Sequence, residues 1–127
     1  PGGPCLYAER FFTDEYRTPL SGRDAAAGLL ACLEHGAPGE TYHLAGGERI
    51  NRYQFGQRFA SQGEGSLGLD VSLLAQGVQA DVPMPAPRAR DVSLAGDRAR
   101  RDLGFEPSPL DAELRWTARR LADLSER

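Results

Sequence analysis

The chain has 127 residues, a net charge of -3 at pH 7 and an acidic pI of about 5.4. A domain of this size folds without a disulfide or metal staple, but it is too short to hold a dinucleotide-binding domain and a substrate domain together. The acidic balance argues against nucleic-acid binding, and no apolar run reaches the roughly 18 residues that span a bilayer. We therefore expect neither nucleic acid nor membrane as a partner.

All fifteen basic residues are arginine, and the sequence contains no lysine. This excludes a Schiff-base lysine, a phosphate-loop lysine and a Tyr-Lys catalytic pair. The arginine bias, together with the many alanines and glycines, is typical of a GC-rich bacterial genome. Cys5 and Cys32 are isolated, so we expect free thiols. With no charged segment followed by an apolar run at the start, we expect no signal peptide and a cytoplasmic protein.

The first third of the chain predicts short strands followed by a helix. Residues 5–20 mix aromatic and charged side chains, which favours one or two short strands. Asp24 is expected to cap a helix with apolar residues at helical spacing, and Gly36 is expected to follow its last residue, His35. A histidine in the last turn suits the negative end of the helix dipole.

The middle of the chain predicts a buried strand and a second helix. Thr41–Gly46 reads as the strand, and Asn51 as the cap of a helix that ends at Gly63. The six residues that begin there, GEGSLG (63–68), match the dinucleotide fingerprint G-x-G-x-x-G letter for letter. That motif functions after a strand and before a helix, and the order expected here is the reverse. We therefore expect these glycines to contact no cofactor.

The last third predicts one strand and two helices. Residues 69–82 are apolar and favour a strand, and residues 83–91 must be extended because of their alternate prolines. A short helix is expected with Asp97 as its cap and Gly104 as its stop. The last helix is expected to start at the serine–proline pair 108–109, with serine as cap and proline as the first helical residue.

Few residues predict chemistry by type alone. His43 is expected to be a core or half-buried histidine within its strand. Cys32 and His35 lie one helical turn apart, but no further ligands stand at zinc-finger spacing, so we expect no metal site. The charged run Asp14–Arg17 fits a solvated strand end or the wall of a binding site equally well.

Arg88 and Arg90 are the strongest candidates for binding. Two arginines at alternate positions of an extended segment point in a similar direction, and paired guanidinium groups suit a diphosphate or a carboxylate. The alternative is a pair of surface arginines, one of them bonded to Asp91.

Three runs resemble a known family when they are taken in order: residues 14–36, 39–60 and 87–114. The first reads DEYRTPLSGRDAAAGLLACLEHG, the second GETYHLAGGERINRYQFGQRFA, and the third PRARDVSLAGDRARRDLGFEPSPLDAEL. They resemble the C-terminal, substrate-binding part of extended short-chain dehydrogenase/reductases. The resemblance covers roughly residues 10–115. It is greatest to the dTDP-4-dehydrorhamnose reductase-like branch, alongside the NAD-dependent nucleotide-sugar epimerases and dehydratases.

The resemblance implies a set of substrate-binding residues. Arg88 and Asp91 match the family's Arg-x-x-Asp pair, whose arginine commonly reaches the pyrophosphate of the nucleotide-sugar. Arg17 and Pro19 match a segment near the substrate pocket. With the neighbouring Arg90, the predicted substrate-binding residues are Arg88, Arg17, Pro19 and Arg90.

The family's cofactor turn and its Tyr-x-x-x-Lys motif belong to an N-terminal Rossmann domain, and this chain contains neither. The resemblance therefore implies NAD(P) for a full-length parent but no cofactor and no catalytic residue here, as in a truncated form, a proteolytic remnant or an orphan C-terminal half. We expect one α+β domain over residues 1–127, with about four helices and two or three short strands.

The predicted function is the nucleotide-sugar-binding portion of an NAD(P)-dependent sugar-nucleotide reductase or epimerase, not catalytic by itself. The alternative is a non-catalytic interaction or regulatory subunit derived from the same family. Faces that would pack on a missing sheet would be exposed, so we also expect self-association or exchange of elements between copies.

Overall fold

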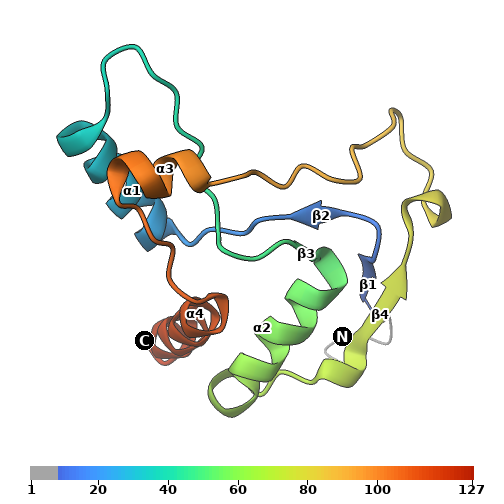
Figure 1. Ribbon diagram of the computed structural model, residues 1–127. Coiled ribbons are helices and arrows are strands. Elements are labelled where there is room, and N and C mark those ends of the chain that lie inside the picture. The colour runs from blue at the N-terminus through green and yellow to red at the C-terminus, as the bar shows by residue number, and fades with distance from the viewer. Residues whose placement is uncertain (1–8) are drawn as a thin grey trace.

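The computed structural model describes residues 9–127, which fold into helices and a few short strands (Figure 1). The expected α+β class is confirmed. Short 3-10 turns at Val71–Leu73 and Gln79–Asp81 flank one of the strands. In chain order, the elements of the described residues are β1 (Glu9–Phe12), β2 (Tyr16–Arg17), α1 (Gly22–His35), β3 (Ile50–Asn51), α2 (Arg52–Leu67), β4 (Leu74–Gly77), α3 (Asp97–Leu103) and α4 (Leu110–Ser125).

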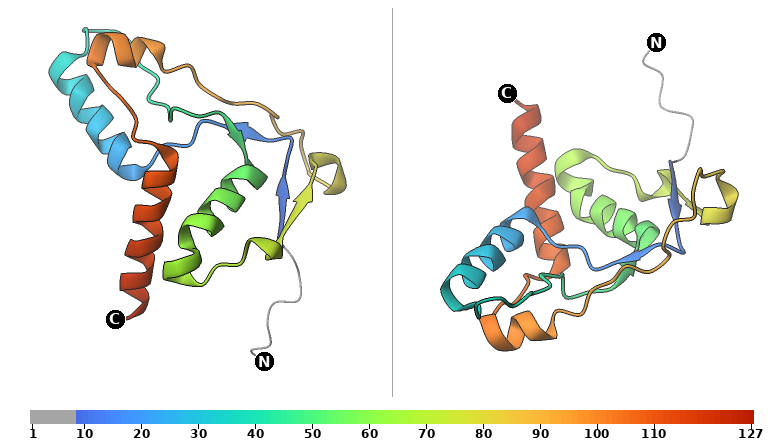
Figure 2. Two further views of the ribbon diagram at one scale, coloured as in Figure 1. Left: turned by 60° about the horizontal axis from the view of Figure 1, so that its bottom comes forward. Right: turned by 90° about the horizontal axis from the view of Figure 1, so that it is seen from above.

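The strands form two small pairs that tie the start of the described chain to its middle. β1 and β4 run parallel, with Glu9 opposite Leu74, and β2 and β3 run antiparallel, with Tyr16 opposite Asn51. A further bridge joins Tyr16 to Asp91. Residues 83–91, which we call the proline-rich segment, therefore reach β2 at their end (Figures 1 and 2). A parallel pair requires a long crossover, which here contains both α1 and α2.

The helices pack as two pairs, α1 with α3 and α2 with α4 (Figure 2). Between α2 and α4 the buried residues include Ala60, Gly63 and Ala118, whose small size lets the helix axes approach closely. Between α1 and α3 lies an apolar core whose buried residues are Ala99 and Leu103 of α3 and the following Phe105. The half-buried side chains packed against that core are Leu20, Ala31, Cys32, Tyr42 and Leu44.

The starts of α1 and α4 differ from the sequence prediction because their polar residues bond each other. Ser21, not Asp24, caps α1, and its side chain accepts the Asp24 N–H at 3.1 Å. The Asp24 carboxylate instead accepts the backbone N–H of Ser108 at 2.6 Å and its hydroxyl at 2.8 Å. Ser108 is therefore unavailable as the α4 cap, and Pro109 takes that position. A carboxylate that satisfies two donors on another segment joins the two helix starts.

Two other helix boundaries, the start of α2 and the end of α3, are confirmed. Asn51 caps α2 in a capping box, in which its Oδ1 accepts the Gln54 N–H at 2.8 Å and Gln54 Oε1 accepts the Asn51 N–H at 3.1 Å. Gly104 ends α3 in the left-handed region, at φ 64. Asp97 is the first residue of that helix, and the predicted cap position belongs to Gly96.

The predicted strand at Thr41–Gly46 is wrong. The segment forms no ladder with any described strand, although Gly46 donates to the Thr18 carbonyl at 3.2 Å. Leu44 packs on the core and Ala45 is buried, which explains the apolar pattern. His43 is exposed, so the expectation of a core or half-buried histidine is also wrong.

The GEGSLG run lies in the last turns of α2. The helix continues through Gly63, which is buried against α4, and stops at Gly68 with φ 64; the predicted stop at Gly63 is therefore wrong. A Cβ on Gly63 would lie 2.8 Å from Leu69 Cδ1, so this glycine serves packing. The carboxyl end of a helix presents carbonyl oxygens, whereas a pyrophosphate requires the amides of an N-terminus. The run does not fit a dinucleotide turn.

The glycines of this run predict opposite effects on stability. Gly65 lies inside α2 with open space at its Cβ position, so Gly65→Ala should raise the free energy of unfolding by about 0.5–1 kcal/mol. Gly68→Ala should lower it by about 1 kcal/mol, because its backbone is left-handed. Urea unfolding followed by circular dichroism measures both, and equal stability of the two variants would contradict this assignment of the helix end.

Candidate functional site

A fully buried carboxylate, that of Glu15, lies at the centre of the charged run Asp14–Arg17. Glu15 has an exposed fraction of 0%, and among the described residues it is the largest side chain buried to that degree. A buried carboxylate is costly unless cations and hydrogen-bond donors surround it. The Glu15 side chain is therefore not part of a solvated strand end, the first of the two alternatives for this run.

Arginines and one glutamine surround both oxygens of this carboxylate. Arg52 Nε donates to Oε2 at 2.6 Å, and Gln79 Nε2 donates to Oε1 at 3.1 Å. Arg88 contacts both oxygens, with Nε 3.1 Å from Oε1 and Nη2 3.2 Å from Oε2. Arg17 Nη2 lies 3.9 Å from Oε2. We call Glu15, Arg17, Arg52, Gln79 and Arg88 the Glu15 cluster.

The four side chains that surround Glu15 come from four different parts of the fold. Arg17 lies on β2, Arg52 is the first residue of α2, and Gln79 opens the 3-10 turn after β4. Arg88 lies on the proline-rich segment. A backbone hydrogen bond two residues later, from the Tyr16 N–H to the Arg90 carbonyl at 2.6 Å, joins that segment to β2. The arginine side chains remain half exposed, at 32%, 49% and 43% for residues 17, 52 and 88. The carboxylate of the cluster is therefore buried, while its three arginine side chains are partly exposed to solvent.

Asp91 bonds neither of the neighbouring arginines that the sequence offered as partners. It accepts Arg49 Nε at 2.9 Å and pairs with Arg49 Nη2 at 2.8 Å, and the Arg49 guanidinium stacks on Tyr16 at 3.8 Å from the ring centre. Hydrogen bonds from Ser93 and Arg49 hold the pKa of Asp91 well below its usual value. This pair fixes the proline-rich segment beside β2.

The four predicted substrate-binding residues line two hollows on either side of the Glu15 cluster. Arg17 and Pro19 line a hollow of about 380 Å³ together with Phe11 and Phe55. Arg88 and Arg90 line another of about 350 Å³, completed by residues of the proline-rich segment. Arg52 borders the first hollow, and Gln79 the second. Arg17 and Arg88 are brought together at Glu15, whereas neither Pro19 nor Arg90 bonds that carboxylate.

Sequence reasoning missed Glu15, Arg52 and Gln79. The carboxylate stands in a charged run whose residue types are equally typical of solvent-exposed surface. Arg52 follows the helix cap directly and carries no separate pattern, and Gln79 lies in a segment predicted only as a strand. No spacing rule joins these three positions, because the contacts arise from the fold.

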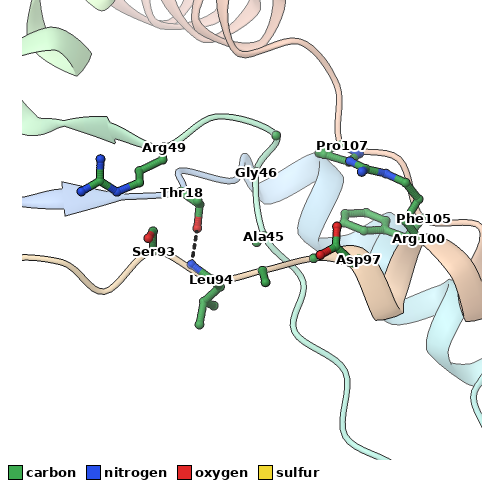
Figure 3. Close-up of a pocket in the computed structure, with 13 residues that line it drawn as sticks. Thr18, Ala45, Gly46, Arg49, Ser93, Leu94, Asp97, Arg100, Phe105 and Pro107 are labelled. Carbon is green, nitrogen blue, oxygen red and sulfur yellow. Dashed lines mark hydrogen bonds between the residues drawn. The ribbon is translucent and has the colours of Figure 1, made fainter.

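A third hollow, of about 450 Å³, lies between α3 and the segment 45–49 (Figure 3). Its wall includes Thr18, which accepts the Leu94 N–H at 3.2 Å through its hydroxyl. Two arginines border it, but Arg49 is paired with Asp91, and Arg100 Nε lies 2.7 Å from Glu106. Each of the two arginines of this hollow therefore has a carboxylate of its own, whereas three arginines share one carboxylate in the Glu15 cluster.

The part of the chain that the structure describes holds no group of metal-ligating side chains and no membrane-spanning helix. Over residues 9–127, no three His, Cys, Asp or Glu side chains gather closely enough to hold a metal ion. Cys32 is a free, half-buried thiol, and His35 is exposed at the end of α1; Cys5 lies outside the described residues. No helix in that range combines the length and the apolar character needed to cross a bilayer.

Comparison with known proteins defines the class. Residues 9–122 match the family model described as the RmlD substrate binding domain. The chain therefore belongs to this family, which confirms the resemblance to dTDP-4-dehydrorhamnose reductase-like proteins.

A similar curated protein is the probable low-salt glycan biosynthesis reductase Agl14 of Haloferax volcanii, which is 29% identical over 103 residues. The aligned region covers 81% of this chain but 33% of that relative, so the chain spans about one third of its length. No solved structure gives a significant match.

The Asp91 pair predicts how acid affects the proline-rich segment. Because the pKa of Asp91 is lowered in the folded protein, its contribution to stability is complete above about pH 4 and is lost as the pH falls toward the folded pKa. Amide protection around residues 88–93 should fall on acidification, and Asp91→Asn should reproduce this at neutral pH. Hydrogen exchange measures both, with the exposed Asp123→Asn as control. Unchanged protection in Asp91→Asn would contradict the assignment.

Proposed function

We propose that this chain is the nucleotide-sugar-binding portion of an NAD(P)-dependent sugar-nucleotide reductase or epimerase, and that Arg88 contacts the pyrophosphate. One observation carries the proposal: Arg88 is held at both Nε and Nη2 by a buried carboxylate. Its remaining nitrogen, Nη1, bonds no described residue. A guanidinium held along one edge keeps its other donors directed and available for an anion.

The charge of the Glu15 cluster suits a diphosphate. Three guanidinium groups and one carboxylate give the cluster itself a net charge of two positive, which the neighbouring Asp14 carboxylate, an acceptor of the Gln79 N–H at 3.0 Å, offsets in part. A diphosphate that links a nucleoside to a sugar carries two negative charges. In a partly buried setting such a match favours binding more than it would in open water.

In this proposal, the hollow that Arg17 and Pro19 line holds one organic end of the ligand, either the sugar or the nucleoside. Its wall includes the aromatic rings of Phe11 and Phe55, and the aliphatic side chain of Ile50. Aromatic faces bind sugars and bases by stacking, and a few convergent polar groups orient them. In this proposal Arg17 stands between the apolar hollow and the phosphates, and Arg90 extends the cationic side along the second hollow.

The role proposed for these residues is binding and orientation. Hydride transfer requires a nicotinamide, which supplies the hydride when bound, and a proton donor. Arginine keeps its proton at physiological pH, and Glu15 is committed to its arginine partners. The glycine run at the end of α2 does not fit a pyrophosphate. No step of the chemistry is therefore assigned to a residue of the Glu15 cluster.

Nucleotide binding tests the proposal. We expect the folded chain to bind UDP or dTDP weakly, and Arg88→Ala to reduce the affinity by about tenfold or more, as for the loss of a charge-assisted hydrogen bond. Isothermal titration calorimetry measures this. Arg120→Ala on α4 removes the same charge far from the site and serves as the matched control. Absence of binding at millimolar nucleotide would overturn the proposal.

A second candidate function, a non-catalytic interaction subunit, is favoured by one face of α1. Leu29, Leu30 and Leu33 are 62%, 60% and 83% exposed, and their spacing places them on one side of the helix. Exposed leucines in such a group are typical of a surface that binds another protein or another copy of the chain. The same face supports the expected self-association.

Self-association through α1 is testable by mass. We expect the unsubstituted 127-residue chain, called the parent chain in these experiments, to form dimers or larger species at high concentration. Leu30→Glu or Leu33→Glu should shift it to a monomer by placing a charge in the contact. Light scattering measures the mass. Leu124→Glu, at a 50% exposed leucine near the end of α4, is the control. A monomeric parent would contradict self-association, and an effect of the control as large as that of α1 would contradict the assigned face.

A further inference from the structure

Arg52, like Arg88, bonds the buried Glu15 carboxylate, but through Nε alone, and neither the family match nor the sequence pattern points to it. Its Nε donates to Glu15 Oε2 at 2.6 Å, while its side chain is 49% exposed. No described residue accepts a hydrogen bond from its Nη1 or Nη2. We propose that Arg52 is a second anion-binding arginine, and that Glu15 is the positioning residue that holds Arg52 and Arg88 for one diphosphate. This inference rests on the diphosphate site of the proposed function.

Glu15 is suited to position other residues because its own bonding is complete. Arg88 Nε and Gln79 Nε2 occupy Oε1, and Arg52 Nε and Arg88 Nη2 occupy Oε2. The carboxylate is fully buried, so it contacts neither water nor ligand. Its charge is balanced by the surrounding arginines, which removes much of its repulsion toward a bound anion.

The benefit of such an arrangement is preorganisation. An arginine side chain has many rotamers, and ordering it on binding costs affinity. Here the Nε edges of Arg52 and Arg88 are ordered by the fold before a ligand arrives. Supporting contacts of this kind are what keep binding groups in a productive geometry.

Arg52 and Arg88 line different hollows beside the cluster. Arg52 lines the hollow of Arg17 and Pro19, whereas Arg88 lines the hollow of Arg90. Because both arginines bond the same carboxylate, a diphosphate at the cluster has one arginine from each hollow within reach. A ligand with organic groups at both ends of its diphosphate would place one group on each side.

Inorganic diphosphate is the probe that tests the inference without any nucleoside contact. We expect calorimetry to show that Arg52→Lys weakens its binding by about tenfold although the charge is kept, because lysine lacks the fork that reaches both the carboxylate and the anion. We expect Glu15→Gln to weaken binding as well, although it makes the cluster more positive. Arg120→Ala should leave the affinity unchanged.

A cluster that attracts anions by charge alone gives the opposite results. In that case Arg52→Lys binds diphosphate as tightly as the parent, and Glu15→Gln binds it more tightly. The first result would overturn the assignment of Arg52, and the second would overturn the positioning role of Glu15.

Glu15→Gln removes a buried charge, so its fold is checked by circular dichroism. If it unfolds, NMR of the parent decides the role of Glu15: slowly exchanging Nε–H signals of Arg52 and Arg88, assigned by their loss in Arg52→Lys and Arg88→Ala, support it. Rapid exchange of both signals in the free protein would overturn it.

The outcomes separate this inference from the proposed function. Binding of UDP or dTDP that depends on Arg88 but is unchanged in Arg52→Lys overturns the inference and leaves the proposed function standing. Binding of diphosphate that depends on both arginines, without any binding of UDP or dTDP, overturns the nucleotide-sugar role and leaves the anion site. A parent chain that binds none of these ligands overturns both.

Discussion

The burial of one carboxylate organises this protein. Glu15 is removed from solvent completely, and a charge in that position must be matched by donors within hydrogen-bond distance. The donors that bond this carboxylate are Arg52 at the start of α2, Gln79 after β4 and Arg88 on the proline-rich segment. These segments are held together because no one of them can satisfy the carboxylate alone.

In the function that we propose, the same contacts serve both structure and binding. Arg88 and Arg52 neutralise the buried charge through their Nε edges, and the rest of each guanidinium remains available at the surface. A change at Glu15 must therefore alter both the local packing and the direction of the two arginine side chains. Arg88 lies on a short irregular segment. Its backbone is fixed in turn by the strand-like bonds to Tyr16 and by the Arg49–Asp91 pair.

A second constraint is the close approach of the helices. Gly63 is buried where α2 meets α4, a position in which a side chain would collide with Leu69. Asp24 joins the starts of α1 and α4 by accepting both donors of Ser108. In each case a residue with a familiar local role, a helix stop or a helix cap, serves a contact between elements instead. Competition between local and tertiary use of the same residue accounts for the boundaries that were predicted wrongly.

The sequence by itself determined the mixed class, the four helices and the family, because apolar spacing, the Asn51 capping box and the Gly104 stop are local signals, and the family motifs keep their order along the chain. It also indicated Arg88 as a binding residue. The tertiary structure alone decided that Glu15 is buried and which side chains surround it. Arg52 and Arg88 lie 37 and 73 residues away along the chain. Electrostatic pairing over such separations depends on where the chain folds back, which no local pattern encodes.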